Sequence, residues 1–209
     1  ASSVHVTFAR KAEWDMLAEH GFLQRIDRQF HWLNEGYGSF EDFLATFNSR
    51  KRKALHKERR RVAEQGLLLK TLTGTDIGTQ QWEQFYHFYQ LTYAKRSGHG
   101  GYLSREFFVD TAAGMGDQVV MVLAYLDAHA VAGALYFRSS DTLYGRYWGC
   151  EREYDCLHFE ACYYQPLAWC IANHYQRFEG GAQGEHKMAR GLLPVRTWSA
   201  HWLADKRFA

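Results

Sequence analysis

The sequence predicts an α/β fold in which helices flank a mixed, mainly antiparallel central sheet. Three apolar strands at 119–126, 131–138 and 142–149 follow one another with hairpin-short links. Links of that length join antiparallel neighbours, so these strands form a meander. The segments before and after the meander carry apolar residues at helical spacing, which predicts helices packed on the sheet.

Size and composition set the broad class. A chain of 209 residues and 24.4 kDa fits one domain, or one domain plus part of another. An aromatic content of 16% with two prolines argues against disorder, and no apolar run reaches the ~20 residues of a membrane span. The net charge of +2 does not by itself indicate a polyanionic partner. Four cysteines without a C-x-x-C pair indicate reduced thiols in a cytoplasmic protein.

The two ends of the chain carry a similar pattern. A strand at 4–8, a helix at 11–20 and a strand at 23–32 are matched by a strand at 177–179, a short helix at 187–190 and a strand at 195–203. The last strand of each set contains His-Trp, as His31-Trp32 and His201-Trp202. This echo suggests a fusion of two copies of one fold, with chance identity as the alternative. We therefore expect residues 1–36 to be the tail of a truncated preceding lobe.

A basic helix follows the predicted boundary. Ser39 is an expected N-cap, and one helix is predicted from 40 to 65, ending at Gly66. Its second half carries a dense cationic run that includes Arg50, Lys51, Arg52, Lys53, Lys57 and Arg60. Like charges one turn apart repel each other, so a bound anion would stabilise this helix. A solvated cationic face and a phosphate-binding surface both stay open.

The remaining elements complete the alternation of helices and strands. We predict a strand at 67–72, an aromatic-rich helix at 80–95, and a short helix capped by Ser104. After the meander comes a long helix at 157–175. Pro166 lies inside it and lacks a backbone N–H, so it must kink this helix or begin a new first turn.

The glycine-rich loop near the C-terminus is the strongest candidate site. Gly180, Gly181 and Gly184 stand among polar side chains, and the loop leads into Glu185, His186 and Lys187. Glycines allow positive φ and let backbone N–H groups face an anion or oxyanion. A carboxylate, an imidazole and a cation in a row suit proton transfer beside a charged ligand. The alternative is a solvated turn.

A second set of residues surrounds the start of the long helix. Cys156, His158, Glu160 and Cys162 are metal-ligating types, but their spacing does not match a zinc site, so we predict no metal. A helix N-terminus can bind phosphate, and Arg146 and Trp148 on the preceding strand would lie near it. Core packing is the alternative for Trp148, and it is a weaker one for Arg146.

Several motifs resemble one bacterial family over nearly the whole chain. They are HWLNEGYGSFEDFL, SRKRKALHKERR, LYGRYWGC, LHFEACYY, FEGGAQGEHKMARG and TWSAHW. Together with the order of elements they resemble an uncharacterised family of predicted N-acyltransferases with the GNAT (acyl-CoA N-acyltransferase-like) fold, related to FemAB-type peptidoglycan bridge aminoacyltransferases. The resemblance implies two GNAT-like lobes in tandem, with residues 37–209 forming the second.

The resemblance implies an enzyme that moves an acyl or aminoacyl group from a phosphate-rich carrier to an amine. A peptidoglycan precursor is a candidate acceptor. The phosphate loop of acetyl-CoA enzymes, Q/R-x-x-G-x-G/A, is absent from 151–157, so acyl-CoA and aminoacyl-tRNA both remain candidate co-substrates, and no permanently bound cofactor is expected. The expected partners are the carrier, the amine acceptor, tRNA and the missing N-terminal lobe. The alternative is a non-catalytic module on the same scaffold that binds RNA or an anionic cell-wall precursor.

Roles for individual residues complete this hypothesis. Glu185 or His186 takes the amine proton, with Glu160 and Glu179 as second choices, and loop N–H groups from Gly181 to Gly184 stabilise the oxyanion. The basic helix binds the carrier's phosphates. The expected donor-binding residues are Arg146, Trp148, His158, Gly181, Gln183, Gly184, Lys187 and Arg190.

Overall fold

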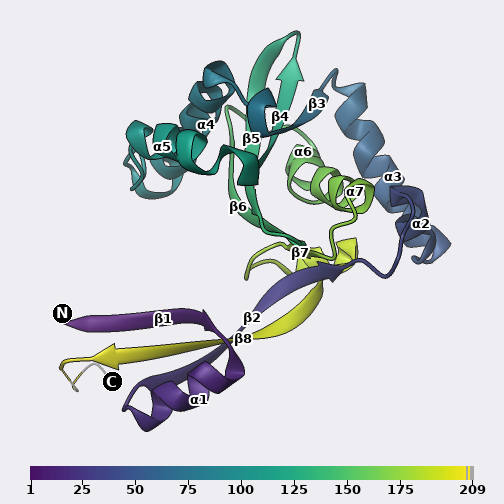
Figure 1. The fold of residues 1–209 in the computed structure, drawn as a ribbon. Coiled ribbons are helices and arrows are strands. Elements are labelled where there is room, and N and C mark those ends of the chain that lie inside the picture. Colours follow the sequence, from purple (N-terminus) through teal and green to yellow (C-terminus); the bar gives the residue numbers. More distant parts are fainter. Residues whose placement is uncertain (206, 208–209) are drawn as a thin grey trace. The chain divides into compact units, whose positions relative to one another are not determined.

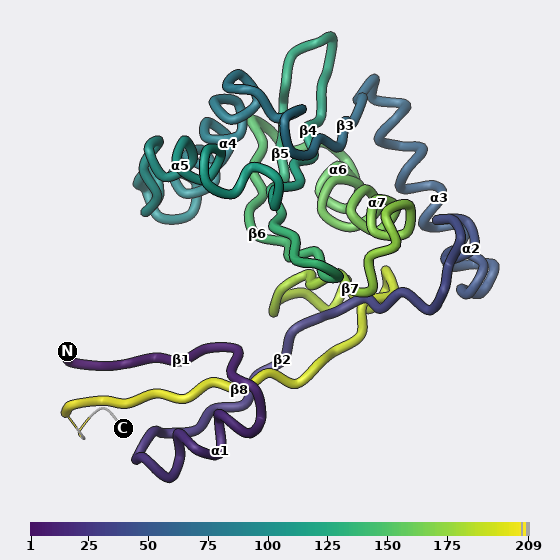
Figure 2. Tube along the Cα trace, in the orientation of Figure 1, coloured from purple at the N-terminus to yellow at the C-terminus, as the bar shows by residue number. Residues whose placement is uncertain are grey.

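The computed structural model describes residues 1–205 and 207 and has the predicted mixed α/β fold (Figures 1 and 2). The chain divides into two compact units. The smaller one combines residues 1–31 with the chain from Ala182 on, and the larger one is Trp32–Gly181. This division by compact units does not test the predicted boundary between two fused lobes at residues 36 and 37, which stays a prediction. Within the described residues, no helix has both the length and the apolar character needed to cross a membrane.

The smaller unit is built on a three-stranded antiparallel sheet with one α-helix and one 3₁₀ helix. Its strands are β1 (Ser3–Ala9), β2 (Leu23–Leu33) and β8 (Leu193–Leu203), and β8 lies between the other two. The last two residues of β2 belong to the larger unit. Helix α1 (Lys11–Glu19) packs on this sheet through Trp14, whose indole N–H donates to the Ser199 carbonyl at 2.9 Å. The predicted short helix at 187–190 begins earlier and is the 3₁₀ helix η4 (Glu185–Arg190).

The larger unit contains the predicted meander. Its strands run in the order β7-β6-β5-β4-β3. Neighbours from β3 to β6 are antiparallel and β7 is parallel to β6, which confirms the mainly antiparallel arrangement. The bounds are β3 (Leu68–Thr73), β4 (Val119–Leu126), β5 (His129–Arg138), β6 (Thr142–Cys150) and β7 (Arg177–Glu179).

Helices cover both faces of this sheet, because successive side chains of a strand point to opposite faces. On one face, α4 (Thr79–Ser97) and α5 (Arg105–Met115) bury their aromatic residues against β4 and β5. On the other face, α3 (Ser49–Glu64) and the helical segment after β6 pack on the sheet (Figure 1). The short 3₁₀ turns η1 (Gly74–Asp76) and η2 (Gly116–Gln118) precede α4 and β4.

The predicted single helix at 40–65 was wrong in one respect, because it is two helices. Ser39 caps α2 (Phe40–Ala45) as predicted, accepting from the Asp42 N–H at 3.1 Å. Asn48 then caps α3, its side chain accepting from the Lys51 N–H at 2.9 Å. Asparagine is among the strongest N-caps, so it begins a new helix rather than continuing the old one.

The predicted helix at 157–175 ends early and contains a π turn. It comprises α6 (Leu157–Phe159), the π segment η3 (Glu160–Tyr164) and α7 (Gln165–Ala172). In π geometry the Ala161 carbonyl would accept from residue 166, but Pro166 has no N–H to donate. The buried hydroxyl of Tyr136 donates to that carbonyl instead. Pro166 therefore lies in a fresh first turn, one of its two predicted outcomes.

Candidate functional site

The part of the glycine-rich loop that belongs to the smaller unit, from Ala182 on, has a backbone that requires glycine. Gly184 has a φ of +100°, which side-chain-bearing residues rarely adopt. The imidazole of His186 packs directly against Gly184, so a Cβ at this position would collide with the ring. The loop therefore holds His186 at the start of η4 through a contact that only glycine allows.

A hollow of about 410 Å³ adjoins this loop in the smaller unit. The structure brings Gln183, Gly184 and Glu185 together in its lining. The lining is completed by Asp27, Arg28, Phe30 and Ala182. The sequence analysis missed Asp27, Arg28 and Phe30, which lie on β2. The pattern of an ordinary strand does not indicate which other segment its side chains will meet. Glu185 is exposed, so its carboxylate can meet a ligand in the hollow.

His186 lies next to Glu185 but not in the lining of the hollow. Burial lowers the pKa of His186, and the positive charges of Arg190 and Lys187 lower it further. A lower pKa keeps the imidazole neutral near pH 7, and the neutral ring is the form that accepts a proton. His186 is therefore available in its proton-accepting form at neutral pH.

The two predicted phosphate ligands on η4 are buried. Lys187 is 5% exposed and Arg190 is 4% exposed. Arg190 donates to the His186 carbonyl at 2.9 Å, and the Lys187 amine lies 5.6 Å from the centre of the Phe30 ring. Both cations make contacts that stabilise the loop, and their positive charges lower the pKa of His186. Binding of donor phosphates would require a ligand to reach them, and this role stays a prediction.

In the larger unit, strand β7 pairs along its whole length with the first three residues of β6. The ladder joins Thr142–Tyr144 to Arg177–Glu179, and β6 then continues to Cys150 beyond the end of β7. A bulge inserts Arg146 just after the strands part, because Gly145 pairs with Tyr136 and Tyr147 with Leu135. Bulges leave backbone groups unpaired and often occur at functional sites. Arg146 is exposed there, with its guanidinium 4.8 Å from the centre of the Tyr147 ring.

Other predicted residues of the larger unit lie around this sheet and the helix after it. Glu179 closes the β6–β7 ladder and is 3.6 Å from the Arg177 guanidinium. Trp148 and His158 are half-buried, with ring centroids 5.5 Å apart. The pair is consistent with packing, so donor binding by these two rings stays a prediction. Gly181 is the last residue of this unit.

Glu160 is buried in the π turn and bound on several sides. Its carboxylate accepts from Arg59 at 3.1–3.2 Å and from the Gln165 amide at 2.8 Å, and the residue is 4% exposed. Because its oxygens are occupied by a guanidinium and an amide and the residue is buried, the carboxylate is not open to a substrate amine, and this geometry favours positioning over base catalysis. The sequence showed Arg59 within the charge run but not its partner 101 positions away.

The basic helix α3 sorts its cations by face. Lys51 lies over the Phe47 ring and Arg52 donates to the Phe47 carbonyl, so both fold back on the chain. Four other cations of α3 are exposed and are spaced three or four residues apart, so they lie along one face of the helix. We call this set the exposed stripe; it consists of Arg50, Lys53, Lys57 and Arg60.

In the described part of the chain, no group of three or more His, Cys, Asp and Glu side chains is placed to hold a metal.

Comparison with known proteins places the chain in a family. All of residues 1–209 match the FemAB_like family, which is described as peptidoglycan biosynthesis/recognition. No curated protein matches the sequence.

Solved structures share the fold at low identity. L-PGS from Bacillus licheniformis has a TM-score of 0.68 at 9% identity, covering 97% of this chain and 68% of that one. FemX has a TM-score of 0.64 at 10% identity, covering 100% and 73%. A GCN5-related glucosamine N-acetyltransferase region of a fungal multi-domain GH3 β-N-acetylglucosaminidase has a TM-score of 0.51 at 9% identity, covering 92% and 23%. The chain therefore belongs to the FemAB_like family of peptidoglycan biosynthesis/recognition, and it shares its fold with a GCN5-related N-acetyltransferase region.

Proposed function

We propose that the chain transfers an acyl or aminoacyl group from a phosphate-rich carrier to an amine acceptor. The carrier is acyl-CoA or aminoacyl-tRNA, and a peptidoglycan precursor is the candidate acceptor. Because both carriers are cytoplasmic, the proposal places the reaction in the cytoplasm. The main support is the pairing of an acid at a hollow, Glu185, with a neighbouring imidazole, His186, whose pKa is lowered.

The chemistry assigns one task to each group. The acceptor nitrogen attacks the carbonyl carbon of the donor, and the bond from that carbon to the carrier's oxygen or sulfur breaks. The attacking nitrogen must lose a proton, which His186 accepts directly or through Glu185 or a water. Loop N–H groups from Gly181 to Gly184 stabilise the oxyanion. The proton then passes to the departing oxygen or sulfur, so the base is restored.

The exposed stripe on α3 provides a binding surface for the carrier. Four cations on one helix face can contact successive phosphates, which attract cations without regard to sequence. Arg146 at the β6 bulge adds a cation beside the strand opening. Both features serve the CoA and the tRNA alternatives, since the two carriers share phosphate chemistry.

Removal of the proposed base tests this function. We expect Glu185→Gln and His186→Ala to lower turnover of a donor–acceptor pair, because general-base groups typically contribute about 10²- to 10⁴-fold. Glu19→Gln and His20→Ala at the end of α1 are matched exposed controls and should retain activity. The readout is transfer of radiolabelled acyl or aminoacyl group from acyl-CoA or charged tRNA to an amine.

Two results would contradict the proposal. Full activity of both Glu185→Gln and His186→Ala would exclude the assigned base while leaving the fold intact. Absence of turnover with either carrier, together with RNA binding that weakens steeply with salt, would favour the non-catalytic binding module instead. The exposed stripe is the observation that favours this second candidate.

A further inference from the structure

Strand β3 forms the outer edge of the sheet in the larger unit. It pairs with β4 on one side, from Leu68 opposite Tyr125 to Thr73 opposite Val120. On its other side, no strand within residues 1–205 and 207 pairs with it. An open edge presents a row of backbone N–H and C=O groups, which is a template for another strand. The six residues of β3 therefore form an unpaired hydrogen-bonding edge.

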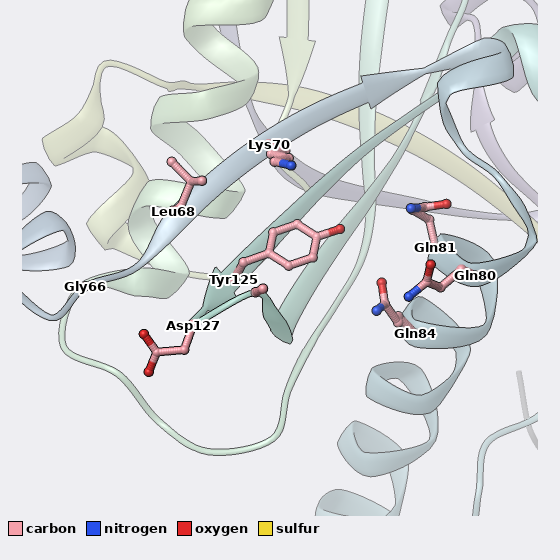
Figure 3. Close-up of a pocket in the computed structure, with 9 residues that line it drawn as sticks. Gly66, Leu68, Lys70, Gln80, Gln81, Gln84, Tyr125 and Asp127 are labelled. Atoms are coloured by element: carbon pink, nitrogen blue, oxygen red, sulfur yellow. The ribbon is translucent and has the colours of Figure 1, made fainter.

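A hollow of about 460 Å³ lies against the even-numbered side chains of β3, Leu68 and Lys70 (Figure 3). Tyr125 lines it from β4, and three glutamines line it from α4. Those glutamines are Gln80, Gln81 and Gln84. The side-chain oxygen of Gln84 is buried and has no hydrogen-bond partner among the described residues. The amide groups of Gln80 and Gln81 also line the hollow and can accept hydrogen bonds, so it suits a ligand that supplies an N–H or O–H.

A second hollow, of about 440 Å³, lies on the other face of the same strand. Arg59 and Arg60 of α3 line it together with Leu69 and Glu160. The Glu160 charge is already balanced by Arg59 at 3.1 Å. Arg60 is exposed and makes no ion pair within the described part of the chain, so the hollow has a net positive charge. It suits a carboxylate.

Lys70 lines only the first hollow and Leu69 only the second, whereas Leu68 borders both. Lys70 reaches the Tyr125 ring in the first hollow, at 5.4 Å from its centre. Leu69 points to the other face, where it packs with Val62 in the core cluster under α3. A strand added to the edge has the same alternation, so its successive side chains would enter the two hollows in turn.

We propose that the β3 edge binds an extended peptide by strand addition. Backbone hydrogen bonds to β3 hold the peptide, carboxylates on alternate residues meet Arg60, and the residues between them donate hydrogen bonds in the glutamine hollow around Gln84. This is the recognition mode in which main-chain bonds give affinity and alternate pockets give specificity. The site involves neither Glu185 nor His186, and it shares only Arg60 with the exposed stripe proposed for the carrier.

A labelled peptide tests the chemistry of the two hollows. The probe is fluorescein-labelled Thr-Glu-Thr-Glu-Thr-Glu, titrated with the full 209-residue chain and followed by fluorescence anisotropy. We expect saturable binding, which Arg60→Glu weakens about tenfold or more, as loss of a charge-assisted contact predicts. Lys53→Glu, on the same stripe but outside the hollow, should leave the Kd within about twofold. A peptide of the same composition with its glutamates in one block should bind more weakly.

Backbone methylation tests the mode of binding. N-methyl groups on alternate residues remove the N–H donors along one edge of an extended peptide. We expect methylation along the edge that faces β3 to abolish binding and methylation along the other edge to leave it. Equal binding of both methylated peptides would overturn strand addition. Absence of saturable binding would overturn the site, and so would self-association of the chain that the probe does not reverse, because a second copy would then occupy β3.

Discussion

The glycine loop shows how single residues set the chemistry of the candidate site. Gly184 adopts a φ of +100° and allows the His186 ring to pack against its Cα. The same short helix buries Lys187 and Arg190, whose charges oppose protonation of that ring. A neutral imidazole beside an exposed carboxylate is the arrangement that an amine acceptor needs.

The pH dependence of His186 follows from the partial burial of its ring and from these charges. Because its folded pKa is lowered, the unfolded chain binds more protons near pH 6, so stability rises with pH in that range. The stabilising contribution is fully present above about pH 6.5, the ordinary value for histidine, and is lost as the pH falls to the lowered pKa. We expect the ring proton of His186 to titrate below about pH 6.5 by NMR, with His186→Gln used to assign the signal. A midpoint above that value would contradict the assignment of a neutral base.

The sequence correctly predicted structural features that depend only on neighbouring residues, such as helix N-caps. Ser39 and Ser104 cap their helices as expected, because N-capping depends on residues within one turn. The pair Arg59–Glu160 was not predictable, since its members lie 101 positions apart and each is an ordinary charge in its own segment. Glu185 became a candidate because of its glycine-rich context, whereas Asp27 and Arg28, which line the same hollow, had no such context.

At the scale of the element, Pro166 changes the helix after β6. The sequence predicted a disturbance there, and the structure shows a π turn directly before the proline. Which carbonyl loses its donor, and which side chain replaces it, depends on the contact with Tyr136 of β5. That contact is set by packing of the helix on the sheet, which no local pattern specifies.

The Tyr136 hydroxyl therefore has a measurable effect on stability. Burial raises the pKa of Tyr136 well above its ordinary value, so the group remains a donor. We expect Tyr136→Phe to lower the free energy of unfolding by about 1–3 kcal/mol, because the Ala161 carbonyl loses that donor while buried. In a Pro166→Ala background the new N–H can serve the same carbonyl, so the cost should fall. Urea unfolding of both single variants and the double variant measures this coupling, and additive effects would contradict it.

At the scale of the whole molecule, the two units are built from different kinds of contact. The meander of the larger unit joins neighbouring segments, and its short links made it predictable. In the smaller unit β8 lies between β1 and β2, and His5 meets His201 across 196 positions. The sequence predicted all three strands but not this order, because pairing over such separations leaves no local signal.

This difference predicts an order of local opening. In β5, Ala132, Ala134 and Leu135 are at most 1% exposed, and the strand has a neighbour on each side. Strand β1 is mostly exposed and pairs with β8 alone among the described residues. Opening free energies are low where few apolar groups are buried. We expect amide hydrogen exchange to be fastest in β1 and slowest in β4 and β5. Protection of β1 equal to that of β5 would show that the smaller unit has stabilising contacts beyond its pairing with β8.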